Sequence, residues 1–487
     1  MLQKKPTKIL KNGILRKPEF LLFLIVLFGL IFRVLFFSGI GTSDDLSYSK
    51  YTNDILDIGI DPDSVLSLSS RVGILYVTAF SYELFGVNDF SSVIFILLTS
   101  IGNIILAYFF GRLLGNEKVG LMAAFLLAIF PLEVIHSTKL FADVPSAFFM
   151  ALGVYLFLYS EKKNKLKINY FLSGIFIGIG YFIRESVILI VLFFLLYVIY
   201  KRAIKKEYFL VAIGFIIMFI VELISLYILT GNPFFKFTVI PDYLLESYIL
   251  YDYFGRLNFP QGLFHYPYII LTNSLVSSFY IFIFVSILYL IKVKKKETYL
   301  MLLWFIPLLL YLSFGSASFT QYLPFVAKAR YLTIITIPGV LLLAFFLVEK
   351  NHFIKRAVMP LALAILLLTS VVSVYLDGSR NLLSNLRDSY PTLSELGKTI
   401  YIDSRSVRAL NYISGYENKL DLREYPDGLA NVEDAYVVIN KDMIRRLKEA
   451  NKKRIFPKEI DNPPENWLLV NKIGKEDINK IIIYYAP

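Results

Sequence analysis

Two adjacent carboxylates, Asp44 and Asp45, are the first candidate catalytic residues along the 487-residue sequence. They follow an apolar segment that ends near residue 38. A carboxylate in this position could accept a proton from a nucleophile, and two of them could hold a divalent cation through oxygen ligands. Ser43 and Asp44 are also ordinary residues for a helix start, so helix capping stays open as the alternative.

A second set of ionisable residues borders other apolar segments. Asp143 precedes Pro145, which fits a helix start and its dipole as well as a role in a site. Arg184 and Glu185 stand among apolar neighbours, where unpaired charges are costly, so we expect partners elsewhere in the chain. The cations of this set could bind a phosphate or extend to lipid headgroups. They are Arg71, Lys139, Arg184 and Arg330.

Cysteine and histidine chemistry is limited in this chain. The absence of cysteine excludes thiol catalysis, thiolate zinc sites, iron–sulfur clusters and disulfides. The three histidines, His136, His265 and His352, lack the spacing of metal ligands. No cofactor is therefore predicted, although a divalent cation at Asp44 and Asp45 stays open.

The elements that position these residues are predicted to be membrane helices. The chain is 56% hydrophobic and 18% charged, with a mean hydropathy of +0.61, whereas soluble domains are about 45–50% apolar and about 25% charged. Its long apolar runs predict an all-α polytopic membrane domain over residues 20–376. This composition excludes soluble enzymes, secreted disulfide scaffolds and disordered chains. We expect eleven spans, at 20–38, 91–111, 119–135, 143–159, 168–183, 186–200, 208–229, 266–291, 298–313, 331–348 and 358–376.

The net charge of +12 is a signal of topology. The segments expected inside hold 23 Lys and Arg against 6 Asp and Glu, while the outer loops between spans hold 8 Lys and Arg. This asymmetry predicts a multi-pass protein of the cell membrane with a cytoplasmic, basic N-terminus (1–19) and an extracytoplasmic C-terminus. It also explains the basic excess without a nucleic-acid partner.

Three outer segments are too long to be simple turns. The first, 39–90, holds eight carboxylates, and its stretch 72–85 is expected to form an interfacial amphipathic helix. The second is 230–265. The third is the tail, 377–487, where short β-type runs alternate with polar helical stretches, which predicts a small α/β domain. The expected strands are 399–403, 435–440, 467–471 and 481–485, and one expected helix is 441–450.

The order of these features resembles the GT-C superfamily of membrane glycosyltransferases, most of all its branch of protein O-mannosyltransferases and aminoarabinose-lipid A transferases. The likeness covers about residues 20–350 and leaves out the tail. Asp45 stands where this branch has glutamate, which shortens that side chain by one methylene. The Trp-Trp-Asp motif of the oligosaccharyltransferase branch is absent, which disfavours that branch. The similar segments are 42–48, 71–76, 84–86, 130–149, 174–185 and 329–331.

The resemblance implies an enzyme that takes a sugar from a polyprenyl-phosphate carrier at the outer membrane face. The acceptor would be a protein, a lipid or a glycan. Asp44 is implied as the catalytic base, with Asp45 as a second carboxylate of open role. A glycosyl phosphate already has a good leaving group, so the site needs this base and positive charge at the departing phosphate. The implied substrate-binding residues are Arg71, His136, Lys139, Asp143, Arg184, Glu185, Arg330 and Tyr331.

A multi-spanning transporter or flippase of a lipid-linked or anionic substrate is the alternative. Such a protein would place ionisable residues near the bilayer midplane and often show two repeated halves. Here the midplane carries few charges, namely Arg33, Glu133 and Glu222, and the sequence shows no repeat. A simple membrane anchor for the tail would not need eleven spans.

Overall fold

The computed structural model describes residues 17–57, 67–163, 166–240, 261–316, 322, 324–325, 327–349, 351–378, 383–417, 419–450, 456–474 and 480–487. The chain divides into two compact units. The first combines Met1–Phe37, Asp61–Ile74 and Phe95–Ser379, and the second combines Ser38–Ile60, Leu75–Ile94 and Arg380–Pro487. Most of the predicted N-terminus 1–19 and much of the outer segment 230–265 lie outside the described residues.

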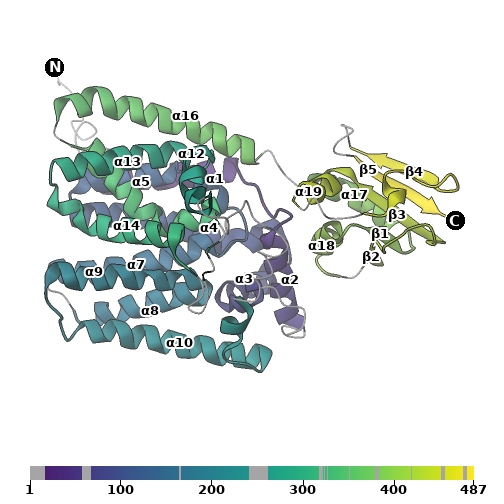
Figure 1. Ribbon diagram of the computed structural model, residues 1–487, viewed down its shortest axis with the longest axis horizontal. Coiled ribbons are helices and arrows are strands. Elements are labelled where there is room, and N and C mark those ends of the chain that lie inside the picture. The colour runs from purple at the N-terminus through teal and green to yellow at the C-terminus, as the bar shows by residue number, and fades with distance from the viewer. Residues whose placement is uncertain are drawn as a thin grey trace, which may run out of the picture. The chain divides into compact units, whose positions relative to one another are not determined.

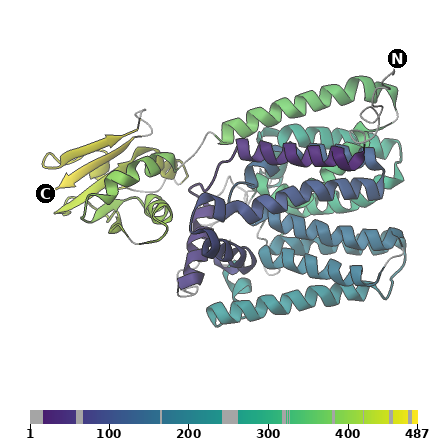
Figure 2. The same ribbon diagram turned by 180° about the vertical axis from the view of Figure 1, so that it is seen from behind.

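The first unit is built from long apolar helices that lie side by side (Figure 1). Figure 2 shows α1, in purple, alongside the other long helices of this unit. Its apolar core is continuous across many of them. The helices are α1 (Pro18–Leu35), α4 (Asp89–Leu114), α5 (Glu117–Ala128), α6 (Pro131–His136), α7 (Asp143–Lys163), α8 (Ile168–Ile183), α9 (Val191–Lys201), α10 (Tyr208–Thr230), α12 (His265–Thr272), α13 (Ser277–Lys292), α14 (Tyr299–Phe314), α15 (Thr336–Leu347) and α16 (Met359–Gly378), where the first residues of α4 belong to the second unit.

A multi-pass membrane protein is confirmed. In the described part of the chain, seven helical segments are long and apolar enough to cross a membrane, or eight if one bent pair counts as a span. Outer faces such as that of α10 expose large apolar side chains, for example Phe209 and Ile228, which suits contact with lipid. Each of the eleven predicted ranges contains a helix, but eleven crossings are not confirmed, since α8 is among the shorter apolar helices.

Two of the predicted spans consist of two helices each. In 119–135, α5 ends at Ala128 and α6 starts at Pro131, because proline suits a first helical turn but removes a donor from a helix interior. In 266–291, α12 and α13 meet at an angle of 111°. The Asn273 side chain accepts a hydrogen bond from the Leu275 amide at 3.0 Å, which stabilises a turn there.

Glycine allows α8 to approach α10 closely. A Cβ on Gly174 would lie 2.0 Å from the Val211 carbonyl oxygen of α10, and one on Gly214 would lie 2.3 Å from the Phe171 oxygen of α8. Backbones can approach this closely only where side chains are absent. The contact fixes α8, and with it Arg184 at the end of that helix.

The second unit contains a five-stranded sheet with the order β2-β1-β3-β5-β4. β1 pairs in parallel with β2 and β3, and β5 pairs antiparallel with β3 and β4. The predicted small α/β domain is therefore present in the tail. The prediction missed β2 and α18. The elements are β1 (Ile400–Ile402), β2 (Leu422–Glu424), β3 (Ala435–Asn440), β4 (Leu468–Ile473), β5 (Ile481–Ala486), α17 (Ser384–Ser394), α18 (Ser404–Ile413) and α19 (Lys441–Ala450).

Parts of the first outer segment belong to the same unit as the tail. These parts are α2 (Asp44–Asp57) and most of α3 (Val72–Phe85), so the predicted helix over 72–85 is present. The helix α18 packs against α2. The sequence predicts 39–90 as an outer segment of the membrane domain. In the structure, however, α2 packs against α18, which lies more than 300 positions later in the chain.

Candidate functional site

Asp143, Arg184 and Arg330 form a buried charged group in the first unit. Together with Arg71 and Glu185, they make up what we call the arginine cluster. Asp143 begins α7, Arg184 ends α8 in an extended conformation, and Arg330 lies in the 3₁₀ turn Ala329–Ile335. Arg184 Nη1 pairs with Asp143 Oδ1, and Arg330 Nε lies 3.9 Å from Asp143 Oδ2. Their exposed fractions are 3%, 4% and 8% in chain order.

Aromatic rings cover the two guanidinium groups of Arg184 and Arg330. Arg184 lies 4.3 Å from the ring centre of Tyr331, and Arg330 lies 4.5 Å from that of Phe141. Arginine stacks favourably on such rings, and the stacking fixes the plane of its donors. Phe141 was not among the predicted residues, since an isolated phenylalanine in an apolar sequence gives no signal.

Arg71 and Glu185 form a bidentate pair beside Arg184. The distances are 3.0 Å from Arg71 Nε to Oε2 and 2.6 Å from Arg71 Nη2 to Oε1. Burial alone would raise the pKa of the Glu185 carboxyl, but the charge and hydrogen bonds of Arg71 lower that pKa well below its usual range. Glu185 is therefore charged. The partners that we expected elsewhere in the chain are Arg71 for Glu185 and Asp143 for Arg184.

Among the described residues, the arginine cluster holds three guanidinium groups and two carboxylates. Arg184 Nε is buried and has no hydrogen-bond partner among these residues. A buried guanidinium donor gains a strong, charge-assisted hydrogen bond when an anion accepts from it. The cluster is therefore suited to an anion.

Lys139 and His136 lie in the segment between α6 and α7. Lys139 Nζ lies 3.0 Å from Asp377 Oδ2 at the end of α16, so a carboxylate offsets its charge. His136 packs against Phe141, and its Nδ1 finds no partner among the described residues. Burial and the charges of Lys139 and Arg330 hold the pKa of His136 well below its ordinary value, which keeps the imidazole neutral at pH 7.

The charged residues noted within the predicted spans pair inside the first unit. Arg33 Nε donates to Ser100 Oγ at 2.9 Å, and Ser100 donates to Glu133 at 3.4 Å. Glu222 Oε1 lies 2.5 Å from Nζ of the fully buried Lys236. Lys236 was not among the residues predicted from the sequence. The only sequence signal for its pair with Glu222 was a single lysine soon after an apolar helix that carries a glutamate.

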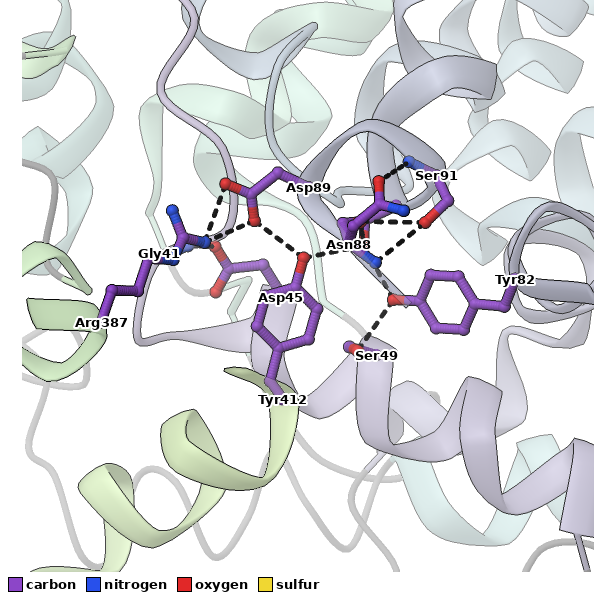
Figure 3. Close-up of polar contacts among 10 residues, drawn as sticks. Gly41, Asp45, Ser49, Tyr82, Asn88, Asp89, Ser91, Arg387 and Tyr412 are labelled. Atoms are coloured by element: carbon purple, nitrogen blue, oxygen red, sulfur yellow. Dashed lines mark hydrogen bonds and ion pairs between the residues drawn. The ribbon is translucent and has the colours of Figure 1, made fainter. Parts of the chain in front are cut away.

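In the second unit, Asp45 rather than Asp44 caps the start of α2. Asp45 is buried, and its carboxylate accepts hydrogen bonds from the amides of Gly41, Ser43 (2.9 Å) and Leu46 (3.0 Å). Figure 3 shows Asp45 beside Gly41. Asp44 is only half-buried. The capping alternative therefore applies to Asp45, and the role of Asp44 as the base stays a prediction.

A chain of hydroxyl groups holds α2 within the second unit (Figure 3). The Tyr82 hydroxyl lies 2.8 Å from Ser49 Oγ of α2 and 2.8 Å from Ser92 Oγ. Ser92 is 3.2 Å from the hydroxyl of Tyr412 in α18, which donates to Asp89 at 2.8 Å. Burial raises the pKa of Tyr82 to about 12, so its hydroxyl stays protonated. We call this set the hydroxyl chain.

The divalent cation that the sequence leaves open at Asp44 and Asp45 stays a prediction. The described residues contain no group of three or more histidine, aspartate or glutamate side chains that could hold a metal ion. The Asp45 oxygens already accept three backbone hydrogen bonds.

Comparison with known proteins places this geometry in context. Residues 72–225 match the family model described as dolichyl-phosphate-mannose-protein mannosyltransferase. ArnT from Cupriavidus metallidurans, bound to undecaprenyl phosphate, matches with a TM-score of 0.63 at 12% identity, covering 96% of this chain and 99% of ArnT. The chain has the GT-C fold of ArnT. The apo structure of the same ArnT matches with the same TM-score at 11% identity, covering 96% of this chain and 98% of ArnT.

A second solved protein has a similar fold. The Archaeoglobus fulgidus oligosaccharyltransferase, in its complex with Zn and sulfate, matches with a TM-score of 0.55 at 13% identity, covering 96% of this chain and 73% of that protein. No curated protein sequence matches the chain. The resemblance to the mannosyltransferase and aminoarabinose transferase branch is thus confirmed, and the expected fold extends through the tail.

Proposed function

We propose that the protein is a membrane glycosyltransferase that moves a sugar from a polyprenyl-phosphate donor to an acceptor protein, lipid or glycan at the outer membrane face. The observation that carries this proposal is the buried Nε of Arg184, which has no hydrogen-bond partner among the described residues and belongs to an arginine cluster within a body of membrane helices. The family model and the structure of ArnT with undecaprenyl phosphate support it.

Arg184 and Arg330 are proposed to bind the donor phosphate. Guanidinium groups match phosphate oxygens in geometry, and they would stabilise the charge that develops on the departing phosphate. Asp143 orients both arginines, and Tyr331 fixes the plane of Arg184. Glu185 holds Arg71 beside them, while Lys139 and His136 border the same site.

The polyprenyl tail would lie in an apolar groove of the first unit. This groove has a volume of about 350 Å³, and apolar side chains of α7 to α10 line it. Ile188, which lines it, follows Arg184 by four residues. An isoprenoid chain would bury its apolar surface there while its phosphate reaches the arginines.

Asp44 is proposed as the general base for the acceptor. It would take the proton of the acceptor hydroxyl as that oxygen bonds to the anomeric carbon. The bond from this carbon to the phosphate oxygen breaks, and its electron pair leaves with the polyprenyl phosphate. The Asp45 carboxylate, hydrogen-bonded to its own turn, would hold Asp44 in place rather than move a proton.

A flippase or transporter of an anionic lipid is the alternative, because the arginine cluster would suit its substrate too. The internal pairing of Arg33, Glu133 and Glu222 argues against it, since these charges are taken up in structural contacts.

Native mass spectrometry of the purified protein tests the donor site. We expect bound polyprenyl phosphate in the wild type and in Arg202→Gln, a control at an exposed arginine. We expect its loss in Arg184→Gln and in the double variant Asp143→Asn/Arg184→Gln, which removes both charges of the pair together. Retention of the lipid in the folded double variant would refute the assignment.

A further inference from the structure

The second unit contains a polar pocket between α2 and the end of α18 that the transfer chemistry does not use. Its volume is about 230 Å³. From α2 come Lys50, Asn53, Asp54 and Asp57, at intervals of three and four residues that place them on one helix face. Ligand sites for drug-sized molecules have about 300–1,000 Å³, so this pocket suits a smaller group.

The side chains from α2 are only partly used by one another. Lys50 Nζ lies 2.6 Å from Asp54 Oδ2, and Asn53 Nδ2 donates to Asp57 Oδ2 at 2.9 Å. Each of these two carboxylates therefore keeps its second oxygen as an acceptor within the described part of the chain. The α2 wall offers acceptors to a ligand.

The opposite wall offers donors and an aromatic side chain. Arg408 donates only through Nε, to the Ser404 carbonyl at 3.4 Å, so its terminal amino groups bind no described residue. The side-chain amide of Asn411 also makes no hydrogen bond to the residues described. Tyr416 donates its hydroxyl to Ser49 at 3.0 Å, which fixes its ring at the pocket.

The backbone at Tyr416 holds its side chain at the pocket. Tyr416 has φ of +63°, a left-handed conformation that is unfavourable for a bulky side chain. The turn that ends α18 enforces it, because the Tyr416 amide donates to the Asn411 carbonyl at 2.8 Å.

The charges of the pocket balance, because Lys50 and Arg408 face Asp54 and Asp57. This balance disfavours a phosphate and suits a neutral ligand. Hydroxyl groups both donate and accept, so a sugar ring can satisfy donors on one wall and acceptors on the other. An aromatic side chain gives the apolar face of such a ring a surface to lie on.

We propose that this pocket binds a sugar ring of a glycan acceptor, at a distance from the hydroxyl that reacts. The proposal rests on the proposed function for its role as an acceptor subsite. Asn53 follows Asp44 by nine residues of the same helix, or roughly 13 Å along its axis. A glycan of a few rings could therefore occupy the pocket while its terminal hydroxyl lies near Asp44.

Saturation-transfer NMR on the purified full-length protein tests this binding without donor or turnover. The probes are the methyl glycosides of mannose, glucose and galactose, with inorganic phosphate as competitor. We expect saturable binding of at least one glycoside to the wild type and to Asp44→Asn. Arg408→Ala and the milder Asn411→Asp should weaken it about ten-fold. Arg423→Ala, at an exposed arginine of the same unit, is the matched control.

The outcomes separate the pocket from the transfer reaction. Binding that is lost in both pocket variants but kept in Asp44→Asn supports the subsite, even if Asp44→Asn proves fully active and the proposed base is wrong. The absence of saturable binding for all three glycosides overturns the subsite, as does binding that phosphate displaces or that folded pocket variants retain.

Discussion

The arginine cluster and the pocket between α2 and α18 both gather charged side chains, but their charge balance differs. The cluster buries three guanidinium groups with two carboxylates, whereas the pocket has two charges of each sign on side chains that are partly exposed. Buried guanidinium groups favour an anionic ligand, and balanced donors and acceptors favour a neutral polyhydroxyl ligand. The comparison suggests that donor and acceptor are recognised by different units of the chain.

The two regions are also stabilised by different contacts. Glycine contacts between α8 and α10 fix the end of α8 that carries Arg184. The hydroxyl chain links α2 to α18, and the pair of Arg387 with Asp89, at 2.7 and 2.8 Å, holds α17 against the start of α4. Loss of the tail would therefore disturb the position of Asp44 first.

If both regions act in transfer at the outer membrane face, α2 and the tail must be accessible from outside the cell. Labelling of single cysteines from outside is then either present or absent. Single cysteines are informative here because the native chain has none. Cysteines in α2 or the tail should react with an impermeant maleimide in intact cells, and cysteines near Lys163, Lys205 or Lys295 should not. Labelling of a tail cysteine only after permeabilisation would place the acceptor region on the wrong side.

Asp44→Asn should lower the transfer rate about 10²- to 10⁴-fold, the usual contribution of a general base, because asparagine cannot accept the proton. Asp45→Asn should lower the melting temperature more than Asp44→Asn does, since asparagine offers a single acceptor oxygen where three amides now donate. Rates and melting curves of both purified variants check this. Equal melting temperatures with equal loss of rate would contradict the division of roles.

Arg184→Gln should destabilise the first unit by about 3 kcal/mol, because Asp143 would keep only its longer contact with Arg330. The double variant Asp143→Asn/Arg184→Gln should recover much of this loss, since no carboxylate is then left unpaired. Denaturation in detergent measures both. A double variant as unstable as the single one would show that packing, rather than charge, dominates the site.

His136 provides the smallest expected effect. Its folded pKa lies below the unfolded value of about 6.5, so the unfolded chain binds the proton more readily. Stability should therefore fall as pH drops below about 6.5, by at most about 1.4 kcal/mol per pH unit from this residue. His136→Gln should flatten this dependence between pH 7 and pH 5 in thermal unfolding. An unchanged slope would show that other titratable groups cause the pH dependence of stability.

The sequence predicted helix-forming segments well, because hydrophobicity and the distribution of lysine and arginine reflect the membrane directly. It could not show where a segment bends, as at Asn273, since that depends on a local turn within an apolar stretch. Partners such as Asp143 for Arg184 were expected in kind, but Asp377 and Phe141 depend on packing between distant helices. The packing of α2 with α18 had no local signal at all.

The central claim is sugar transfer from a polyprenyl-phosphate donor, and its most direct measurement follows both products in proteoliposomes. The purified protein would be reconstituted with a donor labelled in the sugar and in the lipid. We predict release of unglycosylated polyprenyl phosphate in equal amount to the sugar transferred to the acceptor, and formation of both products about 10²- to 10⁴-fold more slowly with Asp44→Asn. Movement of intact donor across the bilayer, without cleavage of the bond between sugar and phosphate, would contradict the account and establish a flippase.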